Sequence, residues 1–174
     1  MKIAIISDSH DNVPNMEKAL KYINDQKIKT IVHCGDLCAP SMLISVIVPN
    51  FKSKIYLVNG NVGDPELLEE IAKKYKDVNV CGDTGKIEID GKKIGFTHFP
   101  IEAKKLAETG KYDLVFYGHT HKPWEENLRL TTDNSKTVRL VNPGTLAGMF
   151  YKATFAIYDT ESDKLELKIL ETIR

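Results

Sequence analysis

The first third of the chain alternates short apolar runs with segments whose apolar residues recur at helical spacing. One such segment opens at Pro14 and places Met16, Leu20 and Ile23 on one face. This alternation predicts β-α-β units around a parallel sheet. The expected strands are Ile3–Ile6, Thr30–His33 and Lys54–Val58, and further helices are expected at Met42–Val48 and after Asp64, which caps a helix that begins with Pro65.

After residue 77 the pattern changes to alternating strand-like segments. Asp90–Gly91 is a strong hairpin signal and predicts an antiparallel pair. The expected fold is a single α/β domain over residues 1–174, with two mixed sheets packed face to face and helices outside. The expected elements of this half are the strands Lys86–Asp90, Lys92–Thr97, Leu114–Tyr117, Val138–Val141, Thr154–Tyr158 and Leu165–Leu170, a strand near Arg129, and a helix over Ile101–Glu108.

Composition narrows the possible functions. The chain carries 24 basic and 24 acidic residues, so its formal net charge at pH 7 is zero. This balance argues against a protein that coats nucleic acid or an anionic membrane, because such binding needs clustered Lys and Arg. Few of the basic residues are arginines, which excludes recognition of phosphate by several guanidinium groups.

The cysteines and the start of the chain bear on its compartment. The chain has no run of about 18 apolar residues, and its three cysteines are odd in number. We therefore expect a cytoplasmic protein that keeps its thiols reduced. Cys34 and Cys38 could form half of a structural zinc site, but no second pair accompanies them.

Potential metal ligands gather just beyond the carboxyl ends of the expected strands. Open α/β sheets place their ligand sites at this edge. Taken singly, most of these clusters are typical of surface turns or of a hydrogen-bonded histidine at a strand end. Independent turns would have no reason to fall at corresponding strand ends of one domain. The five clusters are Asp8-Ser9-His10, Gly35-Asp36, Gly60-Asn61, Thr97-His98 and Gly118-His119-Thr120-His121.

The residue types indicate which ions such a site would bind. Carboxylate oxygen and imidazole nitrogen together favour Mn, Fe, Co, Ni or Zn, whereas all-oxygen sites favour Mg or Ca. Asp8 and His10 are separated by one residue and can converge on one ion if the turn reverses between them. His119 and His121 share this spacing. His33 lies inside an apolar strand, and we interpret it as a packing or supporting residue.

The ordered motifs resemble those of the calcineurin-like metallophosphoesterases, in particular the small single-domain phosphodiesterases. They span residues 8 to 121, and Asn142-Pro143-Gly144-Thr145 is similar to the Asn-Pro-Gly-Ser that often follows in the family. The resemblance implies a four-layer α/β/β/α sandwich and a hydrolase with two divalent metal ions, with Mn, Ni, Fe, Co or Zn as candidates. It also implies that the metals generate a hydroxide from water, which attacks phosphorus in line.

By motif position, the resemblance implies two sets of metal ligands. Asp36 would belong to both sets, so that its carboxylate bridges the ions. Asp36, Asn61 and His98 would also take part in catalysis. The first ion would be held by Asp8, His10, Asp36 and His121, and the second by Asp36, Asn61, His98 and His119.

The chain departs from the family at three places, one of which is Thr145 in place of the usual Ser of the last motif, a change that retains the hydroxyl. Many larger relatives carry a His directly after the Gly-Asn motif as the general acid, and Val62 stands at that position. Either another group, water or the metal then assists the leaving oxygen, or the preferred substrate has a good leaving group. Asp64 is the candidate acid, with helix capping as the alternative explanation for this residue. Phe99 and Pro100 follow His98 where many relatives have Gly, which is expected to stiffen and narrow one wall of the site.

Two alternatives to a phosphodiesterase remain open from the sequence. A phosphomonoesterase or nucleotide phosphatase would use the same site, and the metallophosphoesterase-like subunit of retromer is a non-catalytic scaffold with this fold. The expected partner is a small phosphoester substrate, with neither broad nucleic-acid binding nor a membrane partner. Met149, Phe150 and Tyr151 are candidates for a contact between copies in a homo-oligomer.

Overall fold

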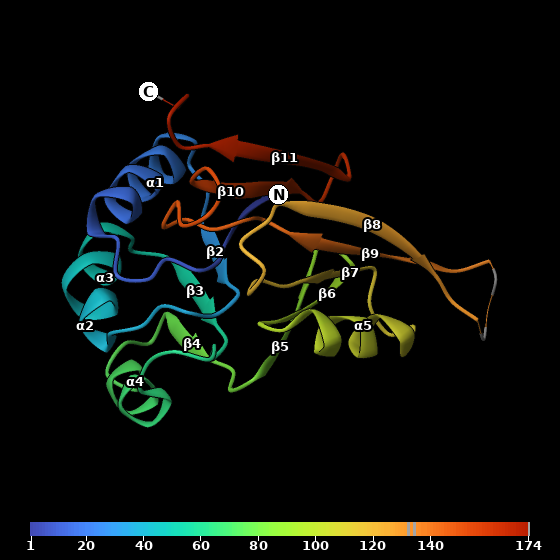
Figure 1. The fold of residues 1–174 in the computed structure, drawn as a ribbon, viewed down its shortest axis with the longest axis horizontal. Coiled ribbons are helices and arrows are strands. Elements are labelled where there is room, and N and C mark those ends of the chain that lie inside the picture. The colour runs from blue at the N-terminus through green and yellow to red at the C-terminus, as the bar shows by residue number, and fades with distance from the viewer. Residues whose placement is uncertain (132, 134, 174) are drawn as a thin grey trace.

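The computed structural model describes residues 1–131, 133 and 135–173, and its two β-sheets are flanked by helices (Figure 1). One sheet has six strands in the order β11-β10-β1-β2-β3-β4. Strands β1 to β4 are parallel to one another, and β10 pairs antiparallel with β1 and with β11. The bounds are β1 Lys2–Ile6, β2 Thr30–His33, β3 Lys54–Leu57, β4 Val78–Val80, β10 Thr154–Asp159 and β11 Lys164–Ile169.

The second sheet has five strands in the order β5-β6-β7-β9-β8. The hairpin predicted at Asp90–Gly91 is confirmed by the antiparallel pair β5 and β6. Strands β6, β7 and β9 run parallel, so both sheets are mixed. The bounds are β5 Thr84–Ile89, β6 Lys92–Thr97, β7 Leu114–Phe116, β8 Trp124–Arg129 and β9 Thr137–Asn142.

Most of the helices lie on the outer face of the six-stranded sheet, and α5 covers the five-stranded sheet (Figure 1). The segment predicted as one α-helix over Met42–Val48 is different in the structure, because a five-residue π-helix, η1, interrupts it. Its apolar residues still face the core. The bounds are α1 Val13–Asp25, α2 Pro40–Met42, η1 Leu43–Ile47, α3 Val48–Asn50, α4 Pro65–Ala72 and α5 Pro100–Glu108.

Alternation along β1 explains why the sheets can form two inner layers. Ile3 and Ile5 point toward the other sheet and pack with residues such as Phe116, whereas Ala4 and Ile6 point toward the outer helices. A third apolar cluster joins α5 to the outer face of the five-stranded sheet. The predicted four-layer sandwich is therefore confirmed.

Strand β4 lies at the edge of the six-stranded sheet. The sequence pattern did not indicate β4, which is only three residues long and half-buried at the sheet edge. No helix in the described ranges is long and apolar enough to cross a membrane.

Candidate metal centre

The five polar clusters meet at one edge of the sandwich, at the carboxyl ends of β1, β2, β3, β6 and β7. Their backbone is unusual, because several of these side chains are carried by residues with a left-handed conformation. Such a conformation is uncommon outside glycine and is concentrated at functional sites. The φ angles are 51° at Asp8, 40° at His10, 55° at Asp36, 67° at His119 and 60° at His121.

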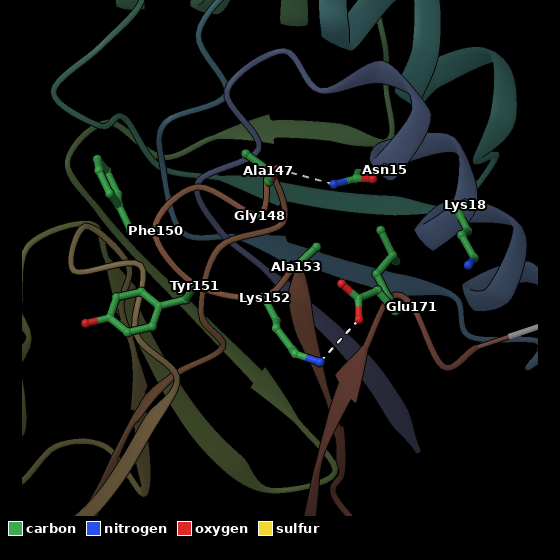
Figure 2. A pocket seen from close by; sticks show the side chains of 10 residues that line it. Asn15, Lys18, Ala147, Gly148, Phe150, Tyr151, Lys152, Ala153 and Glu171 are labelled. Atoms are coloured by element: carbon green, nitrogen blue, oxygen red, sulfur yellow. Dashed lines mark hydrogen bonds and ion pairs between the residues drawn. The ribbon is translucent and has the colours of Figure 1, made fainter.

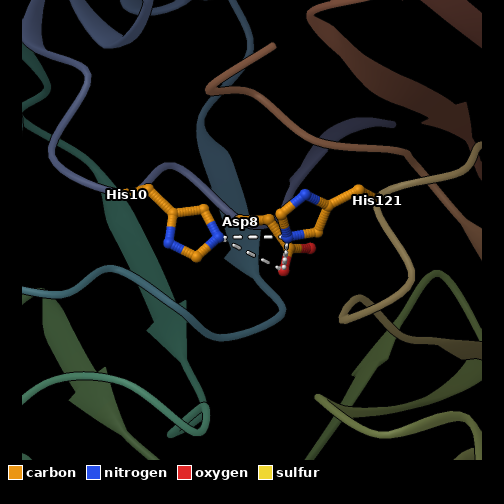
Figure 3. A group of neighbouring side chains, drawn as sticks. All are labelled: Asp8, His10 and His121. Carbon is orange, nitrogen blue, oxygen red and sulfur yellow. Dashed lines mark hydrogen bonds and ion pairs between the residues drawn. The ribbon is translucent and has the colours of Figure 1, made fainter. Parts of the chain in front are cut away.

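Asp8, His10 and His121 form the first group of candidate ligands (Figure 3). The Asp8 Oδ1 atom lies 3.3 Å from His121 Nε2 and 3.9 Å from His10 Nε2. The two imidazole Nε2 atoms are 3.1 Å apart. Residues from the first motif, Asp8 and His10, therefore lie beside His121 from the last of the five clusters, as the sequence predicts.

The second group is centred on His98. Its Nε2 atom lies 3.5 Å from Asp36 Oδ2 and 3.0 Å from Asn61 Oδ1. His119 joins the group, because its Nδ1 atom is 2.9 Å from the same Asn61 oxygen. All seven residues proposed from the sequence as metal ligands are thus brought together in two adjoining groups.

Asp36 connects the two groups. Its Oδ2 atom lies 3.7 Å from His10 Nε2 and 3.5 Å from His98 Nε2, so one oxygen faces a histidine of each group. Its Oδ1 atom accepts hydrogen bonds from the backbone N–H groups of Asn61, at 2.8 Å, and Val62, at 3.1 Å. Backbone donors therefore fix the orientation of the carboxylate, with Oδ2 directed at both histidines.

Two glycines make room for the carboxylates. A Cβ atom on Gly60 would lie 1.9 Å from Asp36 Oδ1, and one on Gly118 would lie 2.6 Å from Asp8 Oδ2. No side chain fits at either position without moving a carboxylate. The glycines that precede Asn61 and His119 in the motifs are thus explained by close approach.

Neighbouring backbone carbonyls assign the protons on two of the histidines. His98 Nδ1 donates to the Cys34 carbonyl oxygen at 2.9 Å, and His121 Nδ1 donates to the Met149 carbonyl oxygen at 3.4 Å. A carbonyl oxygen can only accept, so the neutral imidazoles carry a lone pair on Nε2. This is the tautomer that binds metal through Nε2, with the other nitrogen held by an outer partner.

The electrostatics of the site favour a bound cation. Burial raises the pKa of Asp8. Burial also opposes ionisation of Asp36, but the hydrogen bond and charge of His98 outweigh it and lower the pKa of Asp36. The pKa of His98 is raised in turn, because its interactions with Asp36 outweigh the effect of burial. The interaction between His98 and Asp36 therefore favours positive charge at the position where a metal ion would supply it.

The donor set fits divalent metal ions. Metal–ligand bonds of about 2.0–2.2 Å place neighbouring ligand atoms about 3–3.5 Å apart, close to the separations found within each group. When His98 is neutral with its proton on Nδ1, the lone pair of Nε2 faces oxygen atoms of Asp36 and Asn61, which are also acceptors. Acceptors that face one another in this way are satisfied by a cation.

The remaining candidates lie at the margin of these groups. Asp64 Oδ1 accepts the N–H of Leu67 at 2.9 Å and so caps α4, and its carboxylate is in neither Asp–His group of the described chain. Asp64 and Asn61 line a small cavity of about 210 Å³. His33 is buried, and its Nε2 atom lies 3.0 Å from the Ser9 hydroxyl, which supports the turn between Asp8 and His10.

Two supporting contacts were not indicated by the sequence. Cys38 Sγ lies 3.4 Å from His10 Nδ1, so Cys38 contacts a candidate ligand of the first group. Asn142 Nδ2 donates to the carbonyl oxygen of Gly118 at 2.8 Å and holds the loop that carries His119 and His121. No periodicity or spacing reveals such contacts, because they join segments that are distant in the sequence.

The fold and the site together define a class: a two-sheet α/β sandwich with a candidate dinuclear metal centre at one edge. The family model for the calcineurin-like phosphoesterase superfamily domain matches residues 1–163. The chain belongs to this superfamily.

Comparison with known proteins supports the assignment. The chain is 33% identical to phosphodiesterase MJ0936 of Methanocaldococcus jannaschii, over 98% of this chain and 100% of that protein. It is 31% identical to a structurally characterised archaeal phosphodiesterase, with a TM-score of 0.82 over 97% of this chain and 99% of that one. Vps29 of Entamoeba histolytica, crystallised with Zn²⁺, shares the fold at 18% identity and a TM-score of 0.65, over 98% of this chain and 99% of that one.

Proposed function

We propose that this chain is a phosphodiesterase that depends on two divalent metal ions and hydrolyses a small phosphoester. The observation that carries the proposal is the orientation of Asp36, whose Oδ2 atom faces both His10 and His98. The relative that is a phosphodiesterase by name supports a diester as substrate. The proposed ligands are Asp8, His10, Asp36 and His121 for one ion, and Asp36, Asn61, His98 and His119 for the other.

When bound, the two ions supply positive charge for the phosphoryl oxygens and make water a competent nucleophile at neutral pH. The chain supplies the geometry. Asp36 keeps the two ligand groups at a fixed separation, and the Cys34 carbonyl keeps the Nδ1 proton of His98 away from the centre. With two carboxylates, Asp8 and Asp36, against about four positive charges, the loaded site has a net charge of about +2. A substrate dianion or monoanion is attracted without arginine side chains.

Two positions near Asn61 bear on how the leaving group would be protonated, those of Val62 and Asp64. Val62 is exposed, and its aliphatic side chain has no proton to donate. Asp64, the acid suggested by the sequence, uses its carboxylate to cap α4. We therefore propose that the preferred substrates have leaving groups that need little protonation, such as aryl oxides.

The test is a comparison of a bis-aryl phosphate with the mono-aryl phosphate in the presence of Mn²⁺ or Ni²⁺. A phosphodiesterase has the larger kcat/KM on the diester, and Asp36→Ala and His98→Ala lower it by more than about a hundredfold. Loss of an outer partner of a metal site alone costs about 10–100-fold, so loss of a ligand costs more. Leu167→Ala, on the edge strand β11, is the control and keeps full activity.

Each alternative predicts a different result. A larger kcat/KM on the mono-aryl ester identifies a phosphomonoesterase or nucleotide phosphatase. Purified chain that binds no metal at saturating Mn²⁺ or Ni²⁺, and hydrolyses neither ester, identifies a scaffold. Elemental analysis of the chain as purified distinguishes Mn, Ni, Fe, Co and Zn, because affinity order and availability both select the metal.

A further inference from the structure

Two phenylalanine side chains lie against the histidines of the candidate centre, one at each ligand group. The ring of Phe99 is 4.9 Å from the ring of His98 and 4.8 Å from that of His119, both in edge-on arrangements. The ring of Phe150 is 5.6 Å from that of His121, at 40° to it. Each of the two metal positions thus has one aromatic ring beside its ligands.

Phe150 is exposed to an unusual degree for a large apolar residue. Its exposed fraction is 86%, and its backbone is left-handed, with φ at 64°. Burial therefore does not explain a phenylalanine at this position, and the backbone conformation costs free energy. A contact made in the presence of a ligand would explain both features.

The loop that carries Phe150 is fixed to the metal site. The Met149 carbonyl oxygen accepts the proton of His121 Nδ1, and the N–H of Ala147 donates to the Asp8 carbonyl oxygen at 3.0 Å. Figure 2 shows Phe150 and Tyr151 at one end of a cavity of about 660 Å³, with Lys18 and Glu171 at the other end. The ring is therefore placed beside the centre by two connections to candidate ligands.

Phe99 is held equally firmly on the other side. It precedes Pro100 at the start of α5, and its carbonyl oxygen accepts the N–H of Ala103 at 3.0 Å. Its ring is only half-buried and rests on His119, which is itself exposed. The wall that the sequence predicts to be stiff and narrow is thus an aromatic surface beside the second ligand group.

We propose that Phe99 and Phe150 contact the two ester arms of the substrate, and that the preferred substrates are phosphodiesters with an aromatic ring on each arm. This inference rests on the proposed function. A phosphodiester has two ester substituents, its arms, which leave phosphorus in different directions. The rings of Phe99 and Phe150 lie at different ligand groups, so each is placed to contact one arm. Contacts between aromatic rings favour such arms over alkyl arms.

The test uses two diesters with the same leaving group, bis(4-nitrophenyl) phosphate and methyl 4-nitrophenyl phosphate, with chain loaded with Mn²⁺. The measured quantity is the ratio of kcat/KM for the first substrate to that for the second. In the double variant Phe99→Ala/Phe150→Ala this ratio falls about fivefold or more, through KM rather than kcat, because the aromatic contacts to the second arm are lost. The variant Phe150→Tyr keeps the ratio, and so does Leu167→Ala.

The outcomes separate this inference from the proposed function. If the wild-type chain hydrolyses both diesters and the double variant keeps the same ratio, only this inference is overturned. If the wild-type chain hydrolyses neither diester, the proposed function is overturned and this inference with it. If light scattering shows that Phe150→Ala converts a dimer into a monomer while activity on both diesters falls equally, Phe150 is an interface residue and the inference is overturned.

Discussion

Asp36 shows how much of a candidate metal site one residue can organise. Its two carboxylate oxygens have separate tasks, because backbone N–H groups hold Oδ1 while Oδ2 faces a histidine of each ligand group. The motif Gly-Asp after an apolar strand indicated that this residue would reach the sheet edge. The orientation of its carboxylate could not be predicted, because the donors come from residues 25 and 26 positions away.

Substitutions of Asp64 test whether its carboxylate only caps α4. Because its carboxylate caps α4, Asp64→Asn is expected to keep both stability and activity, since Asn is an equally good cap. Asp64→Ala is expected to lower the free energy of unfolding by about 1 kcal/mol and to leave kcat unchanged. Urea unfolding and diesterase assays measure the two effects. A large loss of kcat in the Asn variant would show instead that Asp64 is the general acid.

His33 gives the protein an acid-sensitive position outside the ligand set. Burial lowers its pKa to about 3, from 6.5 in the unfolded chain. Its Nδ1 atom has no hydrogen-bond partner within the described residues, whereas Nε2 contacts Ser9. Because the unfolded state binds the proton first, stability is full above pH 6.5 and is lost as the pH falls from 6.5 toward 3.

The variant His33→Gln tests whether protonation of His33 causes this loss of stability at low pH. We expect the free energy of unfolding of the metal-free wild-type chain to fall more steeply below pH 6.5 than that of the variant, by at most about 1.4 kcal/mol per pH unit. Urea unfolding at several pH values between 4 and 7.5, with EDTA present, measures the difference. Parallel curves for the two proteins would show that folding does not lower the pKa of His33.

At the scale of elements, the loops beyond the strands carry the site, and the strands only place them. The strands β1, β2, β3, β6 and β7 and the turn chemistry at their ends could be recognised from apolar runs followed by Asp, Gly or His. β4 could not, because three half-buried residues give no periodicity. The π-helix η1 was also missed, since its apolar residues fit an α-helix equally well.

Gly60 tests whether loop geometry sets metal affinity. In Gly60→Ala the new Cβ would meet Asp36 Oδ1 at 1.9 Å, so the Asp36 carboxylate must move, and the affinity for Mn²⁺ is expected to fall more than about tenfold. Gly85→Ala is the matched control, because its Cβ meets the Phe96 ring at 2.1 Å and no candidate ligand is among the nearest atoms. The control is expected to lose stability but to keep the Mn²⁺ affinity. Calorimetric titration of folded protein measures both, and equal affinity in Gly60→Ala and the wild type would refute the role of close approach.

At the scale of the whole molecule, the sequence indicated the layers but not the order of the strands. The C-terminal strands return to pair with β1, and this places residues 145–150 beside Asp8 and His121. Only long-range pairing produces this arrangement, so the exposed Phe150 could be predicted as a surface residue but not as a neighbour of the centre. The zero net charge is compatible with phosphate chemistry, because bound metal rather than composition would supply the cation.

Metal binding should also stabilise the folded chain as a whole. The proposed ligands come from five separate loops and meet only in the folded state, so Mn²⁺ at 100 times its dissociation constant is expected to add about 2.7 kcal/mol to the free energy of unfolding for each site that it occupies. For a chain of this size that corresponds to an increase in Tm of about 5–10 °C. Calorimetric scans with and without Mn²⁺ measure the increase, and Asp36→Asn is the comparison in which it should be small. An equal increase in that variant would place the stabilising metal elsewhere.

The number of metal ions per chain tests the central claim most directly. We expect native mass spectrometry, after reconstitution with Mn²⁺, to find two ions in the wild-type chain and one in His119→Ala, whose side chain belongs to only one ligand group. Asp36→Ala, which removes the shared ligand, is expected to retain less than one ion per chain. A wild-type chain that binds a single ion or none, or an Asp36→Ala variant that retains two, would contradict a dinuclear centre bridged by Asp36.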